Sequence, residues 1–268
     1  MRVADINTNA QTFNIVLIGA GGTGGNLAPM IARLVCNRPG IQFTVVDGDF
    51  VEISNLERQP YLENDLAANK AQTLSEKINI AFGMNTRYYP RFIESIGQLK
   101  SLCLTDEYES SITILIGAVD NYKARAIMEQ YFSKAQNLIY IDSANEDYYG
   151  DVICALKANG ETILKTRGMY RPKEVFSGKG RVKNTSCAVK VIDNPQYYPT
   201  NQMAANIVLK MVSDIIVERN LHAHFINFDT HEYVMFEEEA TCDETTMQLY
   251  CELLEKVNEE GVENVSVV

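Results

Sequence analysis

The stretch FNIVLIGAGGTGGN, residues 13–26, decides the fold of this 268-residue chain. Its first six residues are mostly apolar and predict a short buried strand, and the glycines that follow predict a tight turn. Residues 26–35 then have the apolar spacing of one helix face, and residues 43–46 (FTVV) form a second apolar run. Strand, turn, helix and strand together predict a βαβ unit.

Strands and helices continue to alternate beyond this unit. Further strands are expected at residues 86–89, 113–117, 138–142 and 151–156, and helices at residues 66–82, 122–132 and 200–219. This alternation predicts an α/β fold with a Rossmann-like, mostly parallel sheet and helices on both faces.

Two later regions depart from the alternation. Residues 159–199 are rich in Gly, Pro, Lys and Asn without a sustained period, so we expect a long crossover loop there. Residues 225–236 predict a C-terminal hairpin, and an acidic amphipathic helix is expected from residue 245 onward. The acidic extension begins at residue 237 and follows one large domain.

Composition and charge exclude several classes of protein. The net charge is −11, but residues 237–268 hold ten acidic residues and one lysine, so the rest of the chain carries only −2. Nucleic-acid binding needs a basic stripe and is therefore not expected. No apolar run approaches the length of about 18 residues of a membrane span, and the first residues lack the apolar stretch of a signal peptide, so we expect a cytoplasmic protein without membrane attachment. The six cysteines form no C-x-x-C pair, which argues against a disulfide framework or a cysteine-ligated zinc.

The glycine turn is the first part of a predicted nucleotide site. Gly19, Gly21 and Gly24 have G-x-G-x-x-G spacing, and Gly22 lies between them. Glycines at this place let the backbone approach a phosphate, whose charge the amides of a helix N-terminus stabilise. Asp47 ends the second strand, where a carboxylate can accept hydrogen bonds from ribose hydroxyls. These features fit a dinucleotide dehydrogenase equally well.

Polar residues after the ribose carboxylate separate the two interpretations. The stretch DGDFVEISNLERQ, residues 47–59, places Asn55 and Arg58 in a loop, and Lys70 follows in the next helix. Three such donors suit a triphosphate, because displacing pyrophosphate requires positive charge where negative charge accumulates. Asp120 follows the strand TILIG at the carboxyl edge of the sheet, where ligands bind and where a carboxylate can hold Mg²⁺.

Several separated motifs now occur in one order: D-x-D at residues 47–49, S-N-L-x-R-Q at 54–59, K-A at 70–71 and V-D-N at 119–121. This arrangement, spread over residues 13–215, resembles the ThiF/MoeB superfamily of ubiquitin-activating-enzyme-like adenylating proteins. Within it, KNTSCA at residues 183–188 and TNQMAA at 200–205 most resemble the ThiF-like member of PRTRC plasmid cassettes. The resemblance makes residues 1–236 a ThiF-like adenylation domain.

The resemblance implies a role for each motif residue: ribose binding for Asp47, phosphate binding for Asn55, Arg58 and Lys70, loop support for Gln59, and Mg²⁺ binding for Asp120. Asp49, which is part of the motif, is a further candidate for cofactor binding, and loop capping is its alternative role. The implied reaction is ATP- and Mg-dependent adenylation of the C-terminal carboxylate of a ubiquitin-like protein. A ubiquitin-like protein and a conjugating-enzyme-like protein are the implied partners of a homodimer. Because the attacking carboxylate is already ionised, catalysis needs positioning and charge neutralisation rather than a general base.

Cys187 lies in the predicted crossover loop, where many family members carry a cysteine that forms a thioester or persulfide. Lys183 and Lys190 flank it and would favour the thiolate. A lone cysteine is also often a small buried apolar residue, and this alternative stays open. Two departures from the family pattern are the missing zinc-binding cysteine pairs and the lack of an identifiable arginine for a partner subunit, since Arg2 alone precedes the first strand.

Two other functions remain open on the sequence alone. An NAD-dependent oxidoreductase would use the glycines and Asp47 but would leave Arg58, Lys70 and Asp120 without a role. A non-catalytic scaffold that binds a ubiquitin-like protein is the second alternative. A metal site is not expected at the three histidines, His222, His224 and His231, because they lack the spacing of a known site.

Overall fold

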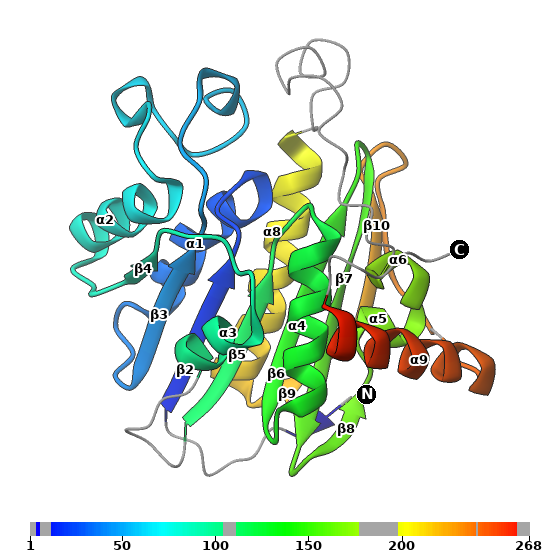
Figure 1. Cartoon of the computed structure of the whole chain (residues 1–268). Coiled ribbons are helices and arrows are strands. Elements are labelled where there is room, and N and C mark those ends of the chain that lie inside the picture. Colours follow the sequence, from blue (N-terminus) through cyan, green and yellow to red (C-terminus); the bar gives the residue numbers. More distant parts are fainter. Residues whose placement is uncertain (1–3, 6–11, 104–110, 177–197, 240, 262–268) are drawn as a thin grey trace.

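The computed structural model describes residues 4–5, 12–103, 111–176, 198–239 and 241–261. Within these ranges nine strands form one sheet in the order β11-β10-β7-β6-β5-β2-β3-β4, with β8 paired to β7 (Figure 1). One half of the sheet is parallel and contains β2 (Thr12–Ile18), β3 (Ile41–Val46), β4 (Arg87–Tyr89), β5 (Ser111–Gly117) and β6 (Leu138–Asn145).

The other half of the sheet is antiparallel. It contains β7 (Tyr149–Ala158), β8 (Glu161–Leu164), β10 (Phe225–Asp229) and β11 (Val234–Glu237). A separate two-stranded pair joins β1 (Ala4–Asp5) to β9 (Asn220–Leu221). The expected Rossmann-like, mostly parallel α/β fold and the C-terminal hairpin are confirmed.

Helices cover both faces of the sheet (Figure 1). One face carries α1 (Gly22–Val35), α2 (Lys70–Phe82) and α8 (Tyr198–Ser213), and the other carries α3 (Ile96–Cys103), α4 (Tyr122–Lys134) and α9 (Glu244–Glu260). Strand β2 shows why both faces are apolar: Ile15 and Leu17 pack in the α1/α8 core, whereas Val16 and Ile18 pack in the α4/α9 core.

The region 159–199 differs from the expected loop in its described part. It holds β8 and two short helices, α5 (Arg167–Tyr170) and α6 (Pro172–Phe176), which contact α9 and α4. Residues 177–197 lie outside the described residues. Elements of four or five residues carry too little periodicity to stand out in such a sequence.

Some element boundaries also differ from the prediction. Helix α2 begins at Lys70 rather than near residue 66, because Asn69 caps it by accepting a 3.0 Å hydrogen bond from the Gln72 backbone N–H. Two 3₁₀ turns, η1 (Ile53–Asn55) and η2 (Glu63–Asp65), precede it. The helix predicted at residues 200–219 ends as a π turn, η3 (Asp214–Glu218). Among the described helices none is both long and apolar enough to cross a membrane.

Glu129 on α4 joins three helices through one fully buried carboxyl group. It accepts hydrogen bonds from Thr166 Oγ1 at 2.6 Å and the Gly168 N–H at 2.8 Å, and Tyr250 Oη of α9 lies 3.5 Å away. Burial raises the pKa of Glu129 from 4.5 to about 7, although the Thr166 and Gly168 hydrogen bonds and Arg167 oppose the rise.

This pKa makes stability depend on pH. Folding favours the protonated Glu129, so its contribution is complete below pH 4.5 and is lost as the pH rises to about 7. The resulting decline in the free energy of unfolding should reach up to about 3 kcal/mol in wild type, and Glu129→Gln should remove it. Urea unfolding at pH 5 and pH 7.5 measures it, with the exposed Glu255→Gln on α9 as the control. An equal pH dependence in wild type and Glu129→Gln would contradict the assignment.

Candidate nucleotide site at the carboxyl edge of the sheet

The glycine turn between β2 and α1 is built from backbone that approaches very closely. Gly19 has φ +97°, and a Cβ there would lie 2.4 Å from the Ala118 carbonyl oxygen. A Cβ on Gly24 would lie 1.9 Å from the Gly19 carbonyl oxygen. Only glycine fits these two positions, so part of the predicted motif serves the fold itself.

Gly21 differs from these glycines because its Cβ position faces open space, with no atom within 4 Å. It precedes α1, whose start has no side-chain cap and no acidic residue in its first turn in the described part of the chain. The first amides of the helix are therefore available to an anion, which the helix dipole also favours. Gly22 begins the helix, and a Cβ there would lie 2.4 Å from Nδ2 of the buried Asn201.

Asp47 joins the end of β3 to this turn. Its Oδ2 accepts a 2.6 Å hydrogen bond from the Ala20 N–H, and its Oδ1 accepts one of 2.7 Å from the Asp49 N–H. Burial raises the pKa of Asp47, although these two N–H groups and Lys70 oppose the rise. Each carboxylate oxygen has a second lone pair, so Asp47 can still accept from a ribose hydroxyl.

Lys70 and Asp49 lie beside Asp47 and carry opposite charges. Lys70 is 6% exposed, and its Nζ lies 3.5 Å from Oδ2 of Asp49, whose side chain is 52% exposed. Asn69 fixes this arrangement by donating from Nδ2 to the carbonyl oxygens of Asp47, at 3.0 Å, and Asp49, at 3.1 Å. A buried ammonium with one half-exposed partner is suited to a second anion.

The loop that carries the remaining predicted donors is tied to the same turn. Tyr61, which is buried, donates from Oη to the Ala20 carbonyl oxygen at 2.7 Å. Arg58 is half-buried in this loop, and Oε1 of Gln59 is a buried atom without a hydrogen-bond partner among the described residues. Sequence reasoning missed Tyr61, although an aromatic residue two positions after Gln59 in a polar loop was an available signal.

Asn55 is buried, and its side-chain oxygen already has a structural role. Oδ1 accepts a 3.0 Å hydrogen bond from the Glu52 N–H, which caps the turn η1. Only the side-chain Nδ2 group of Asn55 can therefore donate to a phosphate.

Asp120 follows β5 and lies in a loop that adjoins the glycine turn. The Ala118 N–H donates to the Ile18 carbonyl oxygen at 2.8 Å, which holds the start of the loop beside the end of β2. Asp120 is exposed, and the next residue, Asn121, caps α4 by accepting a 2.8 Å hydrogen bond from the Ala124 N–H. The strand ends of β2, β3 and β5 thus gather the predicted residues at one edge, as parallel strands allow.

Cys187 was the last predicted site residue, and it lies outside the described residues together with Lys183 and Lys190.

Sequence reasoning also missed a buried ion network below this edge. Asp142 on β6 is 1% exposed and binds Arg125 through Oδ1, at 3.2 Å, and Arg167 through Oδ2, at 2.5 Å. Arg167 also pairs with Asp151 of β7. Burial alone would raise the pKa of Asp142, but the two guanidinium groups outweigh it and hold the pKa below its ordinary value. These four residues, called the buried ion network below, come from four elements, α4, α5, β6 and β7, that sequence periodicity cannot bring together.

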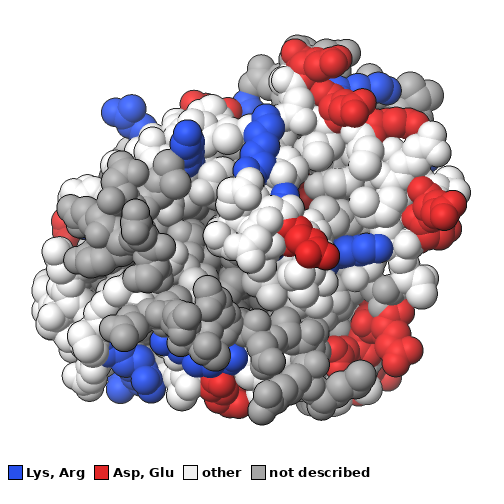
Figure 2. All heavy atoms as spheres, turned by 90° about the horizontal axis from the view of Figure 1, so that it is seen from below, with Lys and Arg blue, Asp and Glu red and all other residues white. Residues whose placement is uncertain are grey.

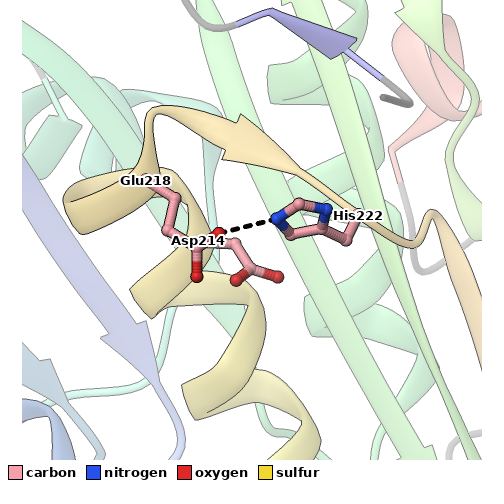
Figure 3. Close-up of side chains that lie close together, drawn as sticks. All are labelled: Asp214, Glu218 and His222. Atoms are coloured by element: carbon pink, nitrogen blue, oxygen red, sulfur yellow. Dashed lines mark hydrogen bonds and ion pairs between the residues drawn. The ribbon is translucent and has the colours of Figure 1, made fainter. Parts of the chain in front are cut away.

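Two other features lie away from this edge. Asp214, Glu218 and His222 place their ligand atoms within 4.8 Å of one another at the end of α8 (Figure 3). Lys210 Nζ contacts Asp214 and lies 3.7 Å from Glu218, so a lysine already compensates the two carboxylates.

Cavities of about 290 and 280 Å³ share Arg38 and Ile41 in their walls, at the amino ends of the parallel strands. None of the predicted site residues lines these two cavities in the part of the chain that the structure describes. From below, the molecule shows basic side chains scattered among acidic ones (Figure 2).

Solved structures share this fold. Escherichia coli MccB in a structure with ATP has a TM-score of 0.61 at 18% sequence identity, over 88% of this chain and 65% of that one. PaaA has a TM-score of 0.61 at 18% identity, over 86% and 65%.

Curated relatives are similar in sequence. Ubiquitin-like modifier-activating enzyme 5 of Arabidopsis thaliana is 26% identical over 158 residues, which are 55% of this chain and 36% of the relative. A probable molybdopterin-synthase adenylyltransferase of Porphyra purpurea is 30% identical over 141 residues, which are 52% and 34%. The chain thus spans about a third of the length of these relatives. The ThiF family model matches residues 5–249, and the chain therefore belongs to the ThiF family.

Proposed function

We propose that this protein uses ATP and Mg²⁺ to adenylate the C-terminal carboxylate of a ubiquitin-like protein. A carboxylate oxygen attacks the α-phosphorus, the bond between the α-phosphorus and the bridging oxygen breaks, and pyrophosphate leaves with that electron pair. The attacking group is ionised at neutral pH and gives up no proton. The site has to hold the reactants and to compensate the charge that accumulates on the phosphates.

One observation carries the proposal: the Cβ position of Gly21, directly before the uncapped start of α1, is open, and charged residues gather at this turn. Asp47 and the start of the Asp120 loop are hydrogen-bonded to it, and Lys70 at the start of α2 lies beside Asp47. A Cβ at Gly21 would meet no atom within 4 Å, so this side of the turn is open. Two relatives, a ubiquitin-like modifier-activating enzyme and a probable molybdopterin-synthase adenylyltransferase, support this chemistry by their names.

We propose a role for each residue of the site. Asp47 accepts hydrogen bonds from the ribose, and the amides after Gly21 bind a phosphate. Lys70 and Arg58 compensate the phosphate charge, and Nδ2 of Asn55 donates to the same group. Bound Mg²⁺ would be held by the exposed Asp120 and would supply further charge compensation. Gln59 and Asp49 support the loops that hold the donors.

An NAD-dependent oxidoreductase would use the same glycine turn, and nucleotide binding separates the two functions. Isothermal titration calorimetry should show tighter binding of Mg-ATP than of NAD⁺, because Lys70 and Arg58 face a triphosphate only in ATP. Tighter binding of NAD⁺, with ATP binding unaffected by Lys70→Ala, would overturn the proposal.

Alanine at two glycines should separate ligand binding from folding. In Gly21→Ala the new methyl group enters the open space that we assign to a phosphate. Because the methyl group and the phosphate would compete for this space, we expect ATP affinity to fall by about tenfold or more, or about 1.4 kcal/mol. In Gly24→Ala the methyl group meets the Gly19 carbonyl, so stability should fall as well. Calorimetric ATP binding and thermal unfolding measure both, and unchanged ATP binding in a folded Gly21→Ala would contradict the phosphate position.

We further propose that the protein acts as a homodimer and that a conjugating-enzyme-like protein receives the activated ubiquitin-like protein.

We also propose that Cys187 attacks the acyl-adenylate after it forms. The thiolate sulfur would bond to the acyl carbon and AMP would leave, so no thiol is consumed during adenylation. Cys187→Ala should therefore retain ATP–pyrophosphate exchange and lose any thiol-sensitive adduct. Gels run with and without reductant test this, and an adduct that persists in Cys187→Ala would place the nucleophile elsewhere.

A further inference from the structure

Asp120 is an exposed side chain on a short loop, yet both of its flanks are fixed. On one side, Arg125 Nη2 donates to the Val119 carbonyl oxygen at 2.8 Å. On the other, the Asn121 side chain accepts from the Ala124 N–H. The backbone on either side of the Asp120 carboxylate therefore cannot shift without breaking one of these bonds.

Arg125 is itself fixed by contacts with strand β6. It is 6% exposed, and the same Nη2 also donates to the Ser143 carbonyl oxygen of β6 at 3.0 Å, while Nε binds Asp142. The guanidinium thus clamps the carbonyl of the Asp120 loop to the neighbouring strand. A planar group with several fixed donors can do this, whereas a lysine ammonium cannot reproduce the geometry.

The rest of the buried ion network orients Arg125. Arg167 binds the other oxygen of Asp142, and Asp151 compensates the charge of Arg167. Two arginines and two aspartates give this network no net charge. Buried pairs of this kind contribute little net stability over apolar packing, so their presence at this place favours a positioning role.

We propose that Arg125 is a positioning residue that fixes the Asp120 carboxylate in the geometry required to hold Mg²⁺ beside the nucleotide. This inference rests on the proposed function, since it assigns Mg²⁺ to Asp120. The Arg125 guanidinium donates to oxygens of Asp142, Val119 and Ser143, so it acts through Asp120 and not on the substrate.

The test uses ATP binding by the full chain, measured by calorimetry over a series of MgCl₂ concentrations. Arg125→Lys should raise the half-saturating Mg²⁺ concentration by about tenfold or more, in the range seen when groups that orient metal ligands are removed. ATP binding without Mg²⁺ should stay within about twofold of wild type. The matched control is Arg38→Lys, because Arg38 lines the two cavities at the opposite edge of the sheet, away from the Asp120 loop and the buried ion network.

A double variant separates positioning from a general structural role. Because Arg125 acts through Asp120, adding Arg125→Lys to Asp120→Asn should change the Mg²⁺ dependence no further. Additive losses, or an unchanged Mg²⁺ dependence in a folded Arg125→Lys, would overturn the proposal.

A third variant covers the case in which Arg125→Lys does not fold. The pair Arg125→Gln with Asp142→Asn leaves no uncompensated buried charge, which is the usual cause of unfolding when one partner is removed. It should fold and show the same rise in half-saturating Mg²⁺. Wild-type protein that binds ATP equally well without Mg²⁺ would overturn both the Mg²⁺ assignment and this inference, whereas a Mg-dependent wild type with unshifted variants would overturn this inference alone.

Discussion

Asp120→Asn is expected to lower the rate of ATP–pyrophosphate exchange at least a hundredfold, at nearly unchanged stability. The substitution keeps the size of the side chain and removes the negative charge that we assign to Mg²⁺ at the carboxyl end of β5. Loss of one charge-stabilising group at a reacting phosphate is worth about 3 kcal/mol. Exchange of labelled pyrophosphate into ATP, with a ubiquitin-like protein that ends in a free Gly-Gly carboxylate, measures the effect.

Asp243→Asn is the matched control for this prediction. Asp243 is exposed and caps α9 by accepting a 2.8 Å hydrogen bond from the Thr246 N–H, a role that asparagine also fills. We expect full exchange in this variant. Wild-type exchange in Asp120→Asn would remove Asp120 from the site.

Arg58→Ala should have an effect of similar size for a different reason. The half-buried guanidinium stands in the loop that Tyr61 ties to the glycine turn, where it can compensate the phosphate charge that grows as pyrophosphate leaves. We expect a loss of about 3 kcal/mol in the exchange reaction, or roughly a hundredfold. Arg58→Lys should recover part of this loss, because it keeps the charge but not the planar donors.

Arg38→Ala is the control for Arg58→Ala. Arg38 lines the two cavities at the opposite edge of the sheet, so removing its charge should leave exchange unchanged. Equal losses in both variants would mean that the net charge of the protein, rather than a group in the site, sets the rate.

The sequence predicted most of the parallel half of the sheet well, because β2, β3, β5 and the first part of β6 are mostly apolar runs, whereas β4 is short and partly exposed. Ile15 and Leu17 on one face and Val16 and Ile18 on the other are all buried, as a strand covered on both faces requires. Helix α3 and the short elements α5 and α6 were not predicted, since eight residues or fewer in a polar context show no clear helical period.

Part of the candidate site could also be predicted from the sequence, and part could not. Asp47, Lys70 and Asp120 follow strands or begin helices, so their meeting at one edge could be predicted from topology. Tyr61 could have been noted as an aromatic residue in this loop, but its partner Ala20 could not be predicted, because the hydrogen bond joins residues 41 positions apart through a loop without periodicity. From the sequence, Arg125 could be assigned only to the predicted helix at residues 122–132. Its partners could not be predicted, because the carbonyls that it binds belong to a loop and a neighbouring strand.

The central claim is that a carboxylate attacks the α-phosphate of ATP at this site. Exchange of labelled pyrophosphate into ATP with a ubiquitin-like protein that ends in Gly-Gly tests it most directly, with the same protein carrying a C-terminal amide as the control. We expect Mg-dependent exchange with the free carboxylate and none with the amide. Exchange that is equal for both forms, or ATP cleaved only to ADP and phosphate, would contradict it.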